Sequence, residues 1–209
     1  VLLTDGEEAG LLGAKAFFAR DPAARRLGLV INLEARGGAG RVVMFETSPR
    51  NGGLIAALQA SAAAPITGSL ANAVYQRMPN GTDLSEAIAA GKAGLNFAFM
   101  GRQIDYHAPS ATPANLHEGA VQSMGAEVLP LARDLAFASA SPAPAPDLVF
   151  SQTFGPVVLA YPPWVGWIVA AAIVGLLAIG AVRAHRRNGL RAADAALGAA
   201  ALIGVAGLA

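Results

Sequence analysis

A long stretch without charge near the carboxyl end limits the folds open to this chain more than any other feature. No Asp, Glu, Lys or Arg occurs over residues 148–182. Its later part, residues 164–182, is close to the ~20 apolar residues that cross a bilayer as a helix. Tyr161, Trp164 and Trp167 stand on one flank, and such residues favour membrane interfaces. A buried core helix is the alternative, but the length and the unequal flanks favour a membrane span at about 164–182.

The other flank of this stretch predicts its orientation. It carries the basic residues Arg183, His185, Arg186, Arg187 and Arg191. Because Lys/Arg-rich loops stay in the cytoplasm, residues 1–147 are predicted on the non-cytoplasmic side, in a periplasm, the exterior or an organelle lumen. A second apolar run, at about 195–209, is the expected start of a return span. Neither end resembles a natural terminus, so we expect an internal piece of a longer integral membrane protein.

The region before the uncharged stretch alternates short apolar runs with helical patterns, which predicts an α/β domain with three layers and a mostly parallel sheet. The predicted strands are Val1–Leu3, Leu27–Leu33, Arg41–Thr47 and Gly94–Met100, and the predicted helices are Glu8–Arg20, Asn51–Ala63, Leu84–Ala90 and one through Val121, Met124, Val128, Leu131 and Leu135. The unbroken apolar run at Leu27–Leu33 suits a strand covered on both faces. We therefore predict a domain over 1–138, a stiff Pro/Ala linker over 139–148 and a membrane region over 149–209.

Charge and cysteine content exclude some kinds of partner and site. The net charge is +1, which argues against a nucleic-acid partner. The chain has no Cys, so disulfides and thiolate metal sites are excluded.

Four side chains near predicted strand ends have the chemistry of a hydrolytic metal site. Glu7 and Glu8 follow the first predicted strand, Glu34 follows the second, and His107 lies in the loop after Gly94–Met100. Such a site needs carboxylate and imidazole ligands, room for water and a base to take its proton. One strand-end Glu alone is usually a solvated charge, and one loop His is usually structural. Four such side chains at one edge of a sheet are better evidence for a metal site.

Three segments carry a resemblance to a known family. They are Asp5-Gly6-Glu7-Glu8-Ala9-Gly10-Leu11-Leu12-Gly13, Asn32-Leu33-Glu34-Ala35-Arg36-Gly37 and Tyr106-His107. Together, in this order, they resemble the co-catalytic two-zinc aminopeptidases, which have a zinc-exopeptidase-like α/β fold. The branch it is most similar to is the membrane-bound one, related to the endoplasmic-reticulum metallopeptidase Fxna and the vacuolar membrane proteases. The resemblance runs through residues 1–137, and the transmembrane segments that follow also fit.

The resemblance implies a role for each matching residue. Glu7 would be the general base that activates water. Glu8 and His107 would bind one zinc ion, and Glu34 the other, where soluble relatives often have Asp. Tyr106 would donate a hydrogen bond to the tetrahedral intermediate. The implied function is a membrane-anchored zinc peptidase, with two zinc ions, that acts on peptide substrates as an aminopeptidase.

Four departures from the family pattern and one ambiguous residue qualify these expectations. Asp83 matches a polar segment near the pocket in this branch, but it could equally cap the helix that follows. Ala108 and Ala111 stand where relatives commonly have Thr and Asp. The family's upstream His and metal-bridging Asp would lie before Val1, so we expect this piece alone to bind zinc poorly and to be inactive.

Two other functions remain open on the sequence. A peptidase-like domain that binds or scaffolds without catalysis is compatible with the replacements at Ala108 and Ala111. Glutaminyl cyclase activity, which related folds carry out with one zinc, is the other; the membrane segments and the Glu34 motif favour the peptidase. An upstream His and Asp would support the enzyme, and a peptide with N-terminal Gln would separate cyclase from peptidase.

Overall fold

The chain forms two units in the computed structural model. The structure describes residues 1–61, 66–153, 155, 157–186, 189, 193 and 196–198. Contacts divide the chain into Val1–Pro162 and Pro163–Ala209. The first unit contains both sheets, and the second contains the long helix α7 (Pro163–Arg186).

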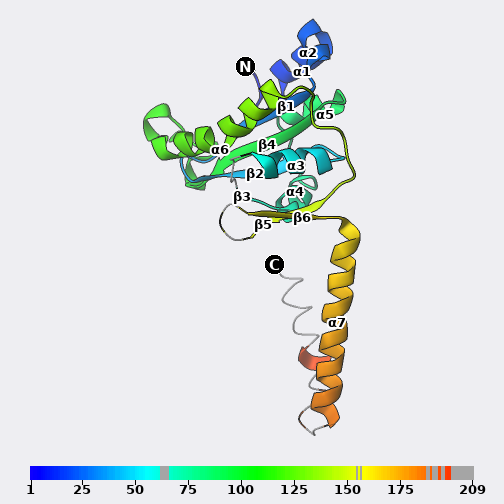
Figure 1. Cartoon of the computed structure of the whole chain (residues 1–209). Coiled ribbons are helices and arrows are strands. Elements are labelled where there is room, and N and C mark those ends of the chain that lie inside the picture. Colours follow the sequence, from blue (N-terminus) through cyan, green and yellow to red (C-terminus); the bar gives the residue numbers. More distant parts are fainter. Residues whose placement is uncertain are drawn as a thin grey trace. The chain divides into compact units, whose positions relative to one another are not determined.

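A mixed sheet forms the centre of the first unit (Figure 1). Its strands, in spatial order, are β1 (Leu29–Arg36), β4 (Ala93–Met100), β2 (Arg41–Thr47) and β3 (Ile66–Thr67). The pairs β1–β4 and β2–β3 are parallel, and β2–β4 is antiparallel. The predicted α/β class with a mostly parallel sheet is therefore confirmed. A separate antiparallel hairpin consists of β5 (Val149–Gln152) and β6 (Val158–Tyr161).

Helices cover the two faces of the sheet, which gives the predicted three layers (Figure 1). The helices are α1 (Leu12–Arg20), α2 (Pro22–Arg26), α3 (Gly52–Ala60), α4 (Ser69–Tyr75), α5 (Asp83–Ala89) and α6 (Glu118–Phe137). The larger core joins α3 and α6 to one face, through side chains such as Leu54, Met124 and Phe97. On the other face, Tyr75 of α4 packs on Phe45 and Ala98. Apolar side chains alternate between these faces along β4, since a strand has a side-chain period of two.

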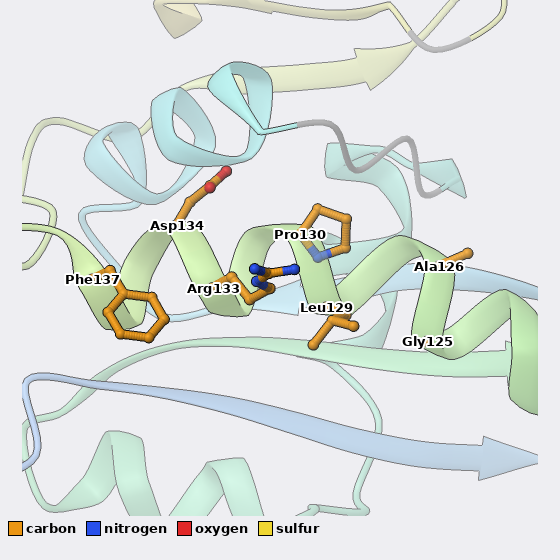
Figure 2. A pocket seen from close by; sticks show the side chains of 7 residues that line it. All are labelled: Gly125, Ala126, Leu129, Pro130, Arg133, Asp134 and Phe137. Atoms are coloured by element: carbon orange, nitrogen blue, oxygen red, sulfur yellow. The ribbon is translucent and has the colours of Figure 1, made fainter.

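The helix α6 confirms the prediction of an amphipathic helix after His107. It buries Ala120, Met124, Val128 and Leu131 against the sheet, at the spacing of one helical face. Val121, which the sequence placed on that face, is exposed. A surface hollow of about 710 Å³ runs along the outer side of α6 and is lined by Gly125, Ala126, Leu129, Pro130, Arg133, Asp134 and Phe137 (Figure 2). None of the predicted site residues lines this hollow.

The beginning of the chain differs from the prediction. Val1–Leu3 is not a strand: these residues are irregular and exposed. A strand needs a hydrogen-bonded neighbour, and these residues pair with no strand in the described part of the chain. The first helix begins at Leu12 rather than Glu8 because Leu11 is left-handed, with φ of 60°, and a left-handed residue interrupts helical geometry.

The second predicted strand is longer and less covered than expected. Within the described residues, β1 pairs only with β4, and Leu33 is 52% exposed, so the predicted coverage on both faces is not found in this structure. Glu34 lies inside β1, two residues before its last residue, rather than beyond its end. The strands predicted at Arg41–Thr47 and Gly94–Met100 are confirmed as β2 and β4.

The Pro/Ala-rich segment predicted as a linker lies along the start of α3. Asn51 connects the two: its backbone N–H donates to Asp147 Oδ1 at 2.8 Å, and its side-chain oxygen accepts from the Leu148 N–H at 2.9 Å. Gly53 allows the close approach, since a Cβ there would lie 2.1 Å from the Ala143 carbonyl oxygen. The hairpin β5–β6 continues this packing and adds Phe150 and Val158 to the larger core.

The second unit contains the helix predicted from the uncharged stretch. Within the described residues, α7 is the one helix long and apolar enough to cross a membrane, by length and composition alone, with a mean hydropathy of 2.5. Its last turn carries Arg183, His185 and Arg186. The second span predicted at 195–209 lies outside the described residues, apart from residues 196–198.

Candidate functional site

The two neighbouring glutamates lie in a tight turn before α1. The Glu7 carbonyl accepts hydrogen bonds from the N–H groups of Gly10 and Leu11, at 2.9 and 2.8 Å. Gly10 has φ of 105°, a conformation that glycine adopts at little cost. Gly13 packs directly on Asp5, where a Cβ would come within 2.7 Å of the backbone. The glycines of the motif are therefore explained by the backbone of this turn, and the turn presents both glutamates.

Glu8 and His107 meet although they are far apart in the sequence. His107 Nε2 lies 2.5 Å from Glu8 Oε1, and both side chains are more than half exposed. The Tyr106 ring stacks on the His107 ring with centroids 3.9 Å apart, and the Arg36 guanidinium lies over the Tyr106 ring at 4.6 Å. The structure thus brings together Glu8 and His107, the two side chains that the resemblance assigns to one zinc ion.

A buried carboxylate fixes the loop that carries His107. Asp105 is 5% exposed; its Oδ2 lies 2.5 Å from Arg102 Nη2, and its Oδ1 accepts from the Ser110 hydroxyl at 2.7 Å. Arg102 and His107 both have positive φ, of 49° and 53°. Such conformations cost energy outside glycine and persist where surrounding contacts impose them.

Four carboxylates, those of Glu7, Glu8, Glu34 and Asp83, interact electrostatically in this region. Burial, then the charges of Glu8 and Asp83, raise the pKa of Glu7, while His107 lowers it. Burial also raises the pKa of Glu34; the hydrogen bond from Asn32 opposes this, and the Glu7, Asp83 and Glu8 charges add to it. Like charges held this close favour uptake of a proton or a cation.

Asp83 belongs to this charged group and is not the helix cap. Thr82 is the N-cap of α5, and its backbone N–H donates to Ser85 Oγ at 3.1 Å. Asp83 is the first helical residue and accepts a hydrogen bond at Oδ2 from the Thr4 hydroxyl. Its Oδ1 is buried and has no hydrogen-bond partner among the described residues. A pocket role for Asp83 stays a prediction.

The side chains fit zinc in kind but not in number. An imidazole nitrogen and carboxylate oxygens are ligands that zinc takes in hydrolytic sites. Within the described part of the chain, no group of three or more His, Cys, Asp or Glu side chains is close enough to hold a metal ion. Glu8 and His107 supply two adjacent donors, and Glu34 supplies one more on β1, so a complete site requires ligands beyond these.

Comparison with known proteins identifies the family. Residues 1–132 match Peptidase family M28. The chain belongs to this family. The M28 metallopeptidases generally use zinc. The assignment agrees with the resemblance carried by the Glu7-Glu8, Glu34 and Tyr106-His107 segments.

Known M28 relatives are much longer than this chain. It is 30% identical to endoplasmic reticulum metallopeptidase 1 of Mus musculus over 200 residues, which are 90% of this chain and 22% of that protein. For the Homo sapiens protein of the same name, the identity is 30% over 182 residues, which are 83% of this chain and 20% of that protein. The chain thus spans about a fifth of the length of these relatives. An aminopeptidase from Aneurinibacillus sp. strain AM-1 is 18% identical to this chain, with 67% of this chain and 34% of that chain covered, at a TM-score of 0.45.

Residues around the M28 motifs also contribute contacts that the sequence analysis did not single out. Asn32 bonds Glu34, Thr4 bonds Asp83, and Arg36 covers Tyr106. The contact between Asn32 and Glu34 could have been predicted from the sequence, because residues two apart in a strand share a face. The contacts of Thr4 and Arg36 depend on loop geometry that sequence patterns do not carry.

The buried Glu46 side chain is expected to make the stability of the fold depend on pH. Its Oε2 accepts from Asn96 Nδ2 at 2.8 Å. Burial nevertheless raises the pKa of Glu46 above 4.5, and burial together with the Glu46 charge raises the pKa of Tyr75 to about 12. The folded state therefore binds the Glu46 proton more tightly than the unfolded state. That contribution to the free energy of unfolding is present at low pH and is lost as pH rises through the raised pKa.

We therefore expect the free energy of unfolding to decline less with rising pH in Glu46→Gln than in the wild type. The Gln side-chain oxygen can still accept from Asn96, and no charge is buried at higher pH. The measurement is thermal unfolding of the full-length protein at a series of pH values from about 4.5 upward. Glu118→Gln, at an exposed position of α6, is the control. An unchanged pH profile for Glu46→Gln would contradict the prediction.

Proposed function

We propose that the full-length protein is a membrane-anchored zinc peptidase that removes amino-terminal residues from peptides. The observation that carries the proposal is the 2.5 Å contact between Glu8 and His107, with Glu7 in the same charged group. These side chains come from the two M28 motifs and have the donor chemistry of a hydrolytic zinc site.

The proposed roles follow from the position and chemistry of each side chain. Glu8 and His107 would hold one zinc ion, and Glu34 would contribute to the second. When bound, zinc supplies a Lewis acid for the peptide carbonyl and for the attacking water. Glu7 accepts the proton of that water. A Glu carboxylate is a usual general base in such a step.

Tyr106 is proposed to stabilise the oxygen of the tetrahedral intermediate by donating a hydrogen bond. Its ring is held between His107 and Arg36, and the residue is 37% exposed, so a substrate can reach it. A preoriented donor of this kind costs little reorganisation during reaction. Asp83, with its buried Oδ1, is proposed as part of the pocket wall.

The membrane anchor is proposed from α7. Its apolar length suits one crossing, and its basic last turn favours the cytoplasmic side. The peptidase unit would then face the periplasm, exterior or lumen. The membrane region proposed here begins at Pro163, because residues 149–161 contain the hairpin β5–β6 of the first unit; the sequence prediction placed its start at 149.

Metal removal tests the proposed function. We expect the full-length protein to lose hydrolysis of unblocked aminoacyl peptides after treatment with a zinc chelator and to regain it with zinc. An N-acetylated peptide, which has no free amino terminus, is the control substrate and should stay intact. Turnover that persists in a metal-free sample would contradict the proposal. Cyclisation of a peptide with N-terminal Gln, without hydrolysis of the other peptides, would replace it with a glutaminyl cyclase.

A further inference from the structure

Part of the long uncharged stretch lies outside the proposed membrane span. Residues 148–161 carry no Asp, Glu, Lys or Arg, and they contain the hairpin β5–β6 of the first unit rather than a part of α7. Within the described residues, β6 pairs only with β5. Proteins usually protect an edge strand with charged side chains, because an uncharged edge invites aggregation. The absence of charge from this hairpin therefore requires an explanation.

The two faces of the hairpin have different surroundings. Phe150 and Val158 belong to the larger core, which also contains side chains of α3 and α6. Ser151 and Leu159 are opposite each other in the antiparallel register, and such pairs share a face. Because side chains alternate along a strand, this is the face opposite Phe150 and Val158. Leu159 is 52% exposed, and Val157, just before β6, is 51% exposed, so the outer face of the hairpin presents apolar side chains.

A second uncharged segment adds to this surface. Residues 66–75 contain β3 and α4 and carry no charged side chain. The Phe150 N–H donates to Ser69 Oγ at 2.8 Å, so α4 begins beside β5 (Figure 1). Leu70 and Val74, about one turn apart on α4, are 78% and 53% exposed. Exposed apolar side chains that gather in this way mark interaction sites.

Chain connectivity indicates what this surface meets. Only Pro162 separates Tyr161, the last residue of β6, from Pro163, the first residue of α7. Two residues of extended chain span at most about 7 Å, so the hairpin ends within that distance of the proposed membrane anchor. Trp164 and Trp167 lie near the start of α7, and Trp and Tyr favour the membrane interface. The hairpin therefore begins where the interface is expected.

We propose that this surface, which we call the hairpin surface, rests in the interface of the lipid bilayer that α7 crosses; it consists of Leu70, Val74, Val157 and Leu159. Its apolar side chains enter the boundary between headgroups and acyl chains, as the apolar faces of interfacial helices do. Burial there also explains why the hairpin needs no charged side chains. The inference rests on the membrane anchor of the proposed function.

The contact orients the peptidase unit on the bilayer. Gly68, directly after β3, forms a β-bridge with Ser151 of β5, so the hairpin lies on the β3 side of the central sheet (Figure 1). Among the described strands, β1 is the last one on the opposite side, and it carries Glu34. With the hairpin surface in the interface, this side of the sheet lies away from the bilayer, where peptides in the aqueous phase can reach it.

The experiment measures the depth of labelled positions in the full-length protein, reconstituted into phosphatidylcholine vesicles. Leu159→Cys or Val157→Cys, in a background free of other cysteines, carries an environment-sensitive fluorophore. Lipids with a nitroxide near the headgroup or deep in the acyl chain serve as quenchers. We expect both labels to lose fluorescence with the shallow nitroxide. Leu129→Cys is the matched control, because Leu129 on α6 is similarly exposed, at 56%; its label should keep its fluorescence.

A label on α7 separates this inference from the proposed anchor. Leu177→Cys, at an exposed position of α7, should be quenched by the deep nitroxide. If that label is quenched while those at Leu159→Cys and Val157→Cys are not, the inference is overturned and the anchor stands. Protection of both hairpin labels from aqueous iodide, without quenching by either lipid, would also overturn it, because another part of the protein then covers the surface. An unquenched label at Leu177→Cys would reject the anchor, and the membrane contact with it.

Discussion

Glu7→Gln is expected to lower kcat of the full-length protein by ~10²–10⁴-fold, the usual contribution of a general base. Gln keeps the size of the side chain and loses the ability to accept the proton from water. Glu7 lies in the turn that also presents Glu8, but it is not a proposed zinc ligand. Zinc content and KM are therefore expected to change little.

The pH profile provides a second readout of the same substitution. Burial and the neighbouring Glu8 and Asp83 raise the pKa of Glu7, and a base acts only when deprotonated. In the wild type, kcat/KM should fall as pH drops through the pKa of Glu7. That acid limb should be absent from the residual activity of Glu7→Gln.

The matched control is Glu118→Gln, an isosteric change at an exposed position of α6. It should leave kcat and the pH profile unchanged. Turnover by Glu7→Gln within a factor of about three of the wild type would assign the base to another residue. A loss of zinc in Glu7→Gln would show instead that Glu7 acts as a ligand.

Sequence patterns predicted the strands well where hydrophobic character decides the outcome. Arg41–Thr47 and Gly94–Met100 are mainly apolar segments of strand length, and both became sheet strands. The pattern failed at Val1–Leu3, because apolar residues form a strand only next to a partner. It failed again at Leu11, whose left-handed conformation is imposed by the turn. Local composition predicts which segments can form strands, but pairing decides which of them do.

The sequence predicted which side chains belong to the candidate site better than it predicted where they lie in the fold. Motifs indicated Glu7, Glu8, Glu34 and His107, and the structure brings Glu8 and His107 into contact. Their strand-end positions were inferred from topology, and that reasoning was inaccurate for Glu34, which lies inside β1.

The hydrogen-bond network of Asn32, Asn96 and Glu46 was not predicted at all, although its members interrupt apolar runs. Asn96 stands inside the run 94–100, and Glu46 near the end of 41–47. A buried polar residue in a strand core indicates a partner. The partner depends on strand order and register, which place Asn32, Asn96 and Glu46 side by side. Neither order nor register follows from the periodicity of single segments.

Gly37→Ala is expected to lower stability by about 3 kcal/mol or more. Gly37 follows β1 with φ of 126°, and a Cβ there would lie 2.1 Å from the Gly101 carbonyl oxygen and 2.8 Å from that of Arg102. The substitution adds backbone strain, which costs about 1–2 kcal/mol for a side chain at positive φ. It also adds an overlap with backbone that cannot be relieved by a rotamer change, and overpacking of this kind costs about 1–3 kcal/mol.

Gly91→Ala separates these two contributions. Gly91 also has positive φ, 75°, but a Cβ there meets nothing within 4 Å. Gly91→Ala should therefore lower stability only by the backbone strain, about 1–2 kcal/mol. The comparison is made by thermal unfolding of the full-length variants, and equal losses for Gly37→Ala and Gly91→Ala would show that the overlap is relieved.

Gly37→Ala should also affect the site, and Gly91→Ala should not. The backbone that Gly37 contacts, at Gly101 and Arg102, leads into the loop of Tyr106 and His107. Relief of the overlap moves this backbone away from β1 and takes His107 with it. Because Glu8 meets His107 in one specific geometry, we expect weaker zinc binding in Gly37→Ala at temperatures where it is still folded. Wild-type zinc affinity in the folded variant would show that the loop and β1 position their ligands independently.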